Sequence, residues 1–76
     1  SAESQKIRDL LSKTIADAQD AIGKTNASYE EIVAKLQTNY QSIYQQIDTA
    51  IPADVKEKVK QALDELKVLI DKVKTK

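Results

Sequence analysis

The segment SYEEIVAKLQTNYQSIYQQI, residues 28–47, decides the fold of this chain because its apolar residues recur at helical spacing. They return every three or four positions, so they form one stripe along a helix. Ser28 and Glu31 match a capping box, in which each side chain binds a free backbone N–H of the first turn. The stripe consists of Tyr29, Ile32, Leu36, Tyr40, Ile43 and Ile47.

The segments on either side have the same spacing. Gly23 follows the first stripe and is expected to cap the C-terminus of a helix. Pro52 precedes the third stripe and suits the first turn of a helix, where its missing N–H has no intrahelical partner. We expect Leu66 in the core and Val68 on the opposite, exposed face. The stripes are Ile7, Leu11, Ile15, Ala18 and Ile22 in the first segment, and Val55, Val59, Ala62, Leu66, Leu69 and Val73 in the third.

These patterns predict an all-α fold with helices at about residues 3–22, 28–48 and 52–74. The linkers are short enough to make neighbouring helices antiparallel. The expected structure is therefore an antiparallel up-down-up three-helix bundle that forms a single domain over residues 1–76. The spacing of three and four residues also predicts coiled-coil-like packing, in which helices cross at about 20°.

The composition argues against an enzyme. Histidine and cysteine are both absent, which removes the usual general base, the thiolate nucleophile and the commonest transition-metal ligands. The chain also has no glycine-rich phosphate loop, acidic calcium loop or nucleophile elbow. We therefore expect a soluble, non-enzymatic protein without catalytic residues, cofactor-binding residues or metal ligands.

Charge and hydropathy limit the classes of partner and the location. Twelve basic residues balance twelve acidic residues, so no overall positive field attracts a nucleic acid. No apolar run approaches the roughly 20 residues that span a bilayer, so we expect no transmembrane helix. The chain begins with Ser1 and not with methionine, which favours a secreted mature form over a cytoplasmic protein without excluding either.

The run LQTNYQSIYQQI, residues 36–47, carries no charged side chain in a chain that is 32% charged. Interface centres are depleted of charge and enriched in tyrosine, and amides form hydrogen bonds without the cost of burying an ion. We therefore expect Gln37, Gln41, Tyr44 and Gln45 to contact a protein partner or a second copy of the chain. The competing interpretation is an ordinary solvated helix face, because glutamine is a good helix former.

Lysines border the apolar stripe of the third segment, with Glu57, Asp64 and Asp71 on its far side. This pattern resembles the lipid-adsorbing helices of exchangeable apolipoproteins, whose basic flanks suit a membrane interface. The resemblance covers about a third of the chain and implies a lipid-binding protein as the alternative function. Border lysines also shield the seams of ordinary helical bundles. The lysines that carry this alternative are Lys56, Lys58, Lys67 and Lys74.

Residues Asn26, Ala27 and Ser28 match the acceptor sequence for N-linked glycosylation in an expected exposed linker. A capping role for Ser28 explains that residue without a glycan. The sequence leaves both interpretations open.

Overall fold

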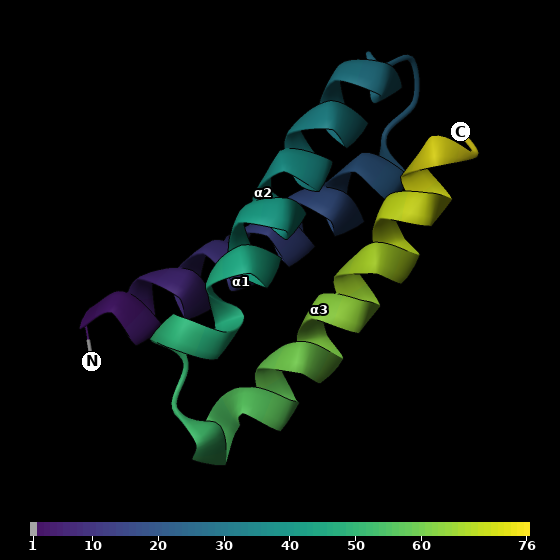
Figure 1. Cartoon of the computed structure of the whole chain (residues 1–76). Helices are drawn as coiled ribbons and strands as arrows, with labels where there is room; N and C mark the ends of the chain where they lie inside the picture. Colours follow the sequence, from purple (N-terminus) through teal and green to yellow (C-terminus); the bar gives the residue numbers. More distant parts are fainter. Residues whose placement is uncertain (1) are drawn as a thin grey trace.

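Three helices form because the only glycine and the only proline of the chain lie at helix ends. The computed structural model describes residues 2–76, with helices α1 (Ala2–Gly23), α2 (Tyr29–Ala50) and α3 (Ala53–Lys74) (Figure 1). Each helix has 22 residues and is therefore about 33 Å long. The observed ends lie within two residues of the predicted ends.

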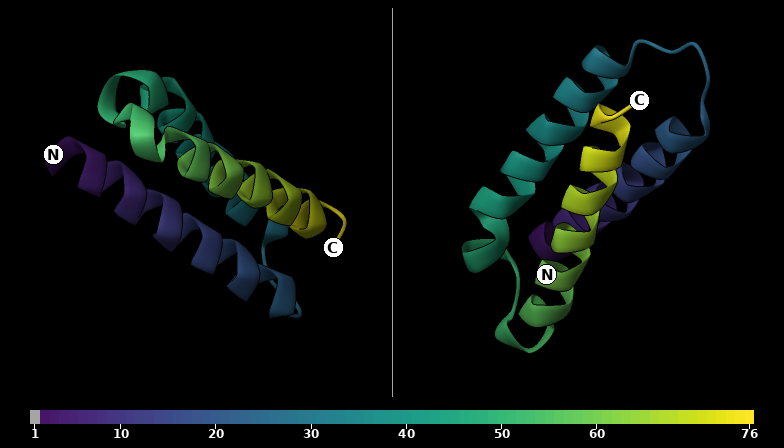
Figure 2. Two further views of the ribbon diagram at one scale, coloured as in Figure 1. Left: turned by 90° about the horizontal axis from the view of Figure 1, so that it is seen from below. Right: turned by 90° about the vertical axis from the view of Figure 1, so that its right-hand side faces the viewer.

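The helices run up, down and up, so that α1 and α3 point the same way and α2 runs against both (Figure 2). Each helix packs against the other two, and the molecule measures 40 × 17 × 16 Å. The expected all-α three-helix bundle is confirmed. The crossing angle of about 20° and the coiled-coil-like packing stay predictions. Within residues 2–76, none of the helices combines the length and the apolar character needed to cross a membrane.

The core follows the predicted stripes in part, because Ala21, Ile51, Leu63 and Ile70 are also buried and lie outside them. Leu66 and Ile43 have no exposed surface, and Val68 is 54% exposed, as the helical phase predicted. In α1, by contrast, Ile15 is only partly buried while its neighbour Thr14 is buried completely. The buried apolar residues are Ile7, Leu11, Ala18, Ala21, Leu36, Ile43, Ile47, Ile51, Val59, Leu63, Leu66, Ile70 and Val73.

Thr14 takes part in a polar contact between α1 and α2. Its hydroxyl donates to the carbonyl oxygen of Leu10 at 2.7 Å and accepts a hydrogen bond from Nδ2 of Asn39 at 3.2 Å. The buried hydroxyl is therefore satisfied, which avoids the cost of an unpaired polar group in the core. The other buried residues of α1 include Ala18 and Ala21, whose side chains are small. Helix α1 therefore contributes less apolar surface to the core than a stripe made only of isoleucine and leucine would.

Two predicted helix ends differ from the structure. Gly23 is the last residue of α1 and has no positive φ, so it is not the left-handed cap that was expected. The residue with left-handed backbone conformation is Asn26, with φ of 56°. The chain therefore turns three residues after Gly23. Ser28 precedes α2, but its side chain makes no capping hydrogen bond, so the predicted capping box with Glu31 does not form. Pro52 lies immediately before α3 in an extended conformation.

Candidate functional site

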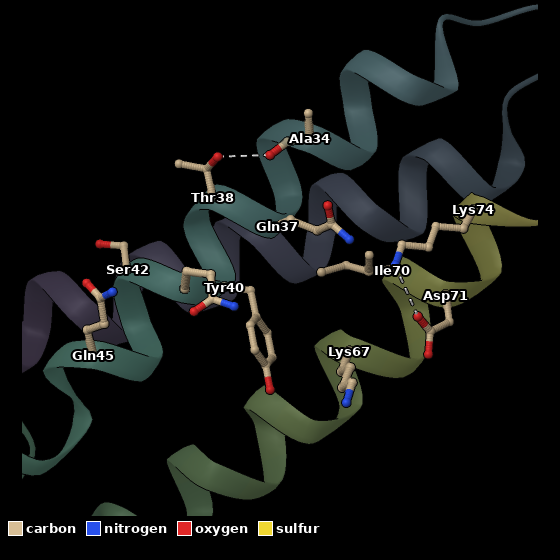
Figure 3. Close-up of a pocket in the computed structure, with 11 residues that line it drawn as sticks. Ala34, Gln37, Thr38, Tyr40, Ser42, Gln45, Lys67, Ile70, Asp71 and Lys74 are labelled. Carbon is tan, nitrogen blue, oxygen red and sulfur yellow. Dashed lines mark hydrogen bonds and ion pairs between the residues drawn. The ribbon is translucent and has the colours of Figure 1, made fainter.

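An open groove of about 770 Å³ runs between α2 and α3 (Figure 3). The groove forms where the edge of the apolar stripe on each helix meets the other helix. Side chains that lie one turn apart along this edge therefore line the same groove. The α2 wall includes Gln37, Tyr40, Gln41 and Gln45. The α3 wall consists of Lys67, Ile70, Asp71 and Lys74.

Three of the four residues expected to bind a partner line this groove, namely Gln37, Gln41 and Gln45. Tyr44 does not line it, but its side chain is 60% exposed and its ring stacks on that of Tyr40. The two ring centroids are 6.3 Å apart, with 17° between the ring planes. Tyr44 therefore extends the surface of the groove through its contact with Tyr40.

The four lysines of the lipid-binding alternative do not lie together. Lys67 and Lys74 line the same groove as the glutamines. Lys56 pairs with Asp48 at the end of α2, with 3.4 Å between Nζ and Oδ1, and its side chain is only 27% exposed. Lys58 is exposed and lines none of the grooves described here. The structure thus brings two of these lysines to the surface that the uncharged run also forms.

The two walls of the groove differ in charge. Its α2 wall carries no charged side chain, whereas its α3 wall carries Lys67, Asp71 and Lys74. Lys74 approaches Asp71 at 4.0 Å, which makes this a loose and exposed ion pair. No carboxylate of residues 2–76 lies within ion-pair distance of Lys67. A molecule bound here would face one neutral wall and one wall with an unopposed ammonium group.

Sequence reasoning missed the contribution of Tyr40 and Ile70 to the groove. Tyr40 was expected in the core, but it is partly buried and lies where α2 meets α3. Figure 3 shows its side chain directed toward α3, while the hydroxyl of Thr38, which also lines the groove, donates to the carbonyl oxygen of Ala34. The sequence contained one indication of the position of Tyr40. Gln37, Tyr40 and Tyr44 recur every three or four positions along one edge of the apolar stripe of α2.

Residues 2–76 also form other surface features, among them two hollows. One of about 690 Å³ continues along α2 and α3 toward the loop between α1 and α2, and one of about 230 Å³ lies between α1 and α2. In the part of the chain that the structure describes, no three His, Cys, Asp or Glu side chains converge in a way that could hold a metal ion. The groove between α2 and α3 is therefore the candidate site with the most distinctive chemistry.

Comparison of the chain with protein families, with characterised proteins and with solved structures finds no match.

Proposed function

We propose that this protein is a non-enzymatic interaction module that binds a helix in the groove between α2 and α3. The helix belongs either to a partner protein or to a second copy of the chain. The observation that supports this function is the uncharged α2 wall, in which Gln37, Gln41 and Gln45 line an open groove beside a tyrosine pair.

The chemistry of the α2 wall favours docking because no charged side chain of this wall has to lose its hydration when a partner binds. Burial of a charged side chain is expensive unless the charge is paired, whereas an amide can exchange water for a hydrogen bond to the partner. Tyr40 and Tyr44 add large contact areas, and tyrosine is enriched at the residues that dominate binding energy. Ile70 contributes an apolar contact from α3. The partner should therefore present an uncharged face with apolar and amide side chains toward α2.

The shape of the groove suits a helix. Two antiparallel helices leave a furrow along their length, and an amphipathic helix commonly binds in such a furrow. Gln37 and Gln45 are eight positions apart on α2 and so span about 12 Å, or two helical turns. Docking there leaves the buried residues of the bundle in place, so the module does not have to unfold in order to bind.

The test is a pair of double variants with opposite charge. Gln41 and Gln45 are both replaced by Lys in one protein and both by Glu in the other. Because either charge has to be desolvated, we expect each variant to weaken binding by at least about tenfold, which corresponds to about 1.4 kcal/mol. Self-association is measured by sedimentation equilibrium. Heteromeric binding is measured as the amount of each binder that an immobilised variant retains from a cell extract.

The matched control carries the same charge changes at Gln19 and Gln61, which are exposed on α1 and α3 and line none of the three hollows described above. Control proteins should bind like the wild type, and all variants should keep the wild-type thermal melt. Unchanged binding of both groove variants would show that this surface is not the binding site. Opposite effects of Lys and Glu would show that charge attraction governs binding, which contradicts docking on a neutral wall.

Lipid adsorption is the second candidate function, and the sheltered stem of Lys56 together with the position of Lys67 and Lys74 favours it. Among residues 2–76, the large apolar side chains that are exposed are Tyr44 and Val68, on different helices. Adsorption therefore requires the helices to separate. A thermal melt followed by circular dichroism, with and without anionic phospholipid vesicles, distinguishes the two functions. A sharp transition that lipid leaves unchanged supports the closed module, whereas loss of the transition with helicity retained supports adsorption.

A further inference from the structure

We propose that Asn26 is an acceptor site for an N-linked glycan when the chain enters the lumen of the endoplasmic reticulum. This inference concerns the loop between α1 and α2 and is independent of the proposed binding function. Three features of that loop carry it: the acceptor sequence, the exposure of Asn26, and the uncommitted hydroxyl of Ser28.

The acceptor sequence lies at the tip of the loop. Asn26, Ala27 and Ser28 have the order that glycosylation requires, and the middle residue is not proline. Asn26 is exposed and has φ of 56°, which turns the chain sharply between the two helices. A non-glycine residue rarely adopts this conformation, and asparagine adopts it more readily than most. The side-chain amide of Asn26 is therefore presented to solvent outside any helix.

The hydroxyl of Ser28 is available as the second element of the acceptor sequence. A serine just before a helix commonly caps it, which would explain Ser28 without a glycan. Here the side chain of Ser28 makes no capping hydrogen bond, and the residue is exposed. Helix capping therefore does not explain the serine at position 28. The acceptor sequence for N-linked glycosylation does require a serine or threonine at this position.

The fold holds the loop in place at its base. The hydroxyl of Tyr29 donates to the carbonyl oxygen of Lys24 at 2.6 Å, and Nζ of Lys76 donates to the carbonyl oxygen of Ile22. Lys76 also lies over the ring of Tyr29, 5.5 Å from its centroid. A glycan at Asn26 would therefore project from one end of the bundle without displacing a helix.

The end of the groove formed by Gln41 and Gln45 lies away from the loop that carries Asn26. Gln41 lies thirteen positions after Ser28, so it is about 20 Å along α2 from the loop. The proposal therefore does not depend on binding at the α2–α3 groove, and it makes no demand on the occupant of that groove.

The modification is a transfer of an oligosaccharide from a lipid-linked pyrophosphate donor. The side-chain nitrogen of Asn26 forms a bond to the anomeric carbon of the first sugar and loses one proton. The bond from that carbon to the phosphate oxygen breaks, and the lipid pyrophosphate leaves with the electron pair. No oxidant or reductant takes part.

The experiment directs the whole chain into the secretory pathway of cultured eukaryotic cells with a cleavable signal sequence. Intact mass is measured before and after digestion with a peptide N-glycosidase. We expect one glycan that the enzyme removes, with deamidation of Asn26 as the mass signature of its former attachment. Ser28→Thr should keep the glycan, whereas Ser28→Ala and Asn26→Gly should both abolish it. Glycine at position 26 also tolerates a positive φ, so we expect Asn26→Gly to keep the fold.

Each secreted protein is checked by circular dichroism for the wild-type helical signal, so that loss of modification is not confused with misfolding. Secreted, folded wild type and Ser28→Thr protein without any glycan would overturn the proposal. So would a glycan that persists in Ser28→Ala, because the attachment would then lie outside this acceptor sequence.

Discussion

Replacement of Leu66 by alanine should destabilise the protein far more than replacement of Val68, although the two residues lie two positions apart on α3. Leu66 has no exposed surface and lies in the core between the three helices. Val68 is 54% exposed on the opposite side of the same helix. The two substitutions therefore lie in the same helix with the same backbone conformation, and differ in what the removed atoms contact.

The expected magnitudes follow from burial. Leucine-to-alanine replacement in a core costs about 2–5 kcal/mol, because apolar transfer energy is lost and a cavity remains. A domain of 76 residues has a total unfolding free energy of about 4–11 kcal/mol at typical values per residue. Leu66→Ala should therefore remove a large share of the stability and lower Tm by at least about 8 °C. Val68→Ala should change stability by less than about 0.5 kcal/mol, since alanine also has the better helix propensity.

The assay is urea unfolding followed by far-ultraviolet circular dichroism, with a thermal melt of the same samples. The wild-type protein and both variants are compared at equal slope of free energy against urea, so that the midpoint reports stability. Equal losses for Leu66→Ala and Val68→Ala would refute the helical phase of α3. A larger loss for Val68→Ala would indicate that α3 presents its other face to α1 and α2.

Two further experiments test the C-terminus of α1 and the polar contact between α1 and α2. Gly23→Ala should stabilise the protein by about 0.4–1 kcal/mol, because Gly23 ends α1 without positive φ and an added Cβ meets no atom within 4 Å; a lower Tm would show that the left-handed cap is needed after all. Thr14→Val and Asn39→Ala, alone and together, form a double-mutant cycle in urea unfolding. The coupling energy should be about 0.5–1.5 kcal/mol if the 3.2 Å hydrogen bond forms in solution, and strictly additive effects would contradict it.

Local pattern was sufficient for the helices and for most of the core. The spacing of apolar residues in α3 gave the phase that buries Leu66 and exposes Val68, because the period of an α-helix relates every residue to every other on the same helix. The interruptions around Gly23 and Pro52 gave the helix ends to within two residues, since neither residue suits a helix interior. These features depend on short stretches of chain, which is why the sequence alone predicts them.

The features that depend on a neighbouring helix were not predictable in the same way. Ile15 is more apolar than Thr14 and was expected in the stripe of α1, but the rotation of α1 buries Thr14 opposite Asn39 on α2. Likewise, Ser28 and Glu31 satisfy the local pattern of a capping box, yet the path of the preceding loop leaves the Ser28 side chain without the expected bond. Local preference is overridden where tertiary packing sets the rotation or the approach of a helix.

The candidate site was predicted in part for the same reason. The missing charges on α2 indicated Gln37, Gln41 and Gln45, because the absence of charge is visible along a single helix. The meeting of these glutamines with Lys67 and Ile70 depends on which border of α2 faces α3, and on the register between the two helices. Neither the orientation of α2 nor the register between the helices can be read from the pattern of one segment. The uncharged run of α2 and the lysines of α3 were therefore recognised as parts of one groove only in the folded chain.

The hydrogen bond between Thr14 and Asn39 has a consequence for the handedness of the bundle. Three helices with similar apolar stripes can turn to the left or to the right with nearly the same hydrophobic core. In this structure Asn39 lies on the border of α2 next to α1, whereas Tyr40 lies on the border next to α3. In the mirror topology α1 would lie beside Tyr40, and the buried hydroxyl of Thr14 would lose its amide partner. One polar pair thus distinguishes two topologies between which hydrocarbon packing alone discriminates weakly.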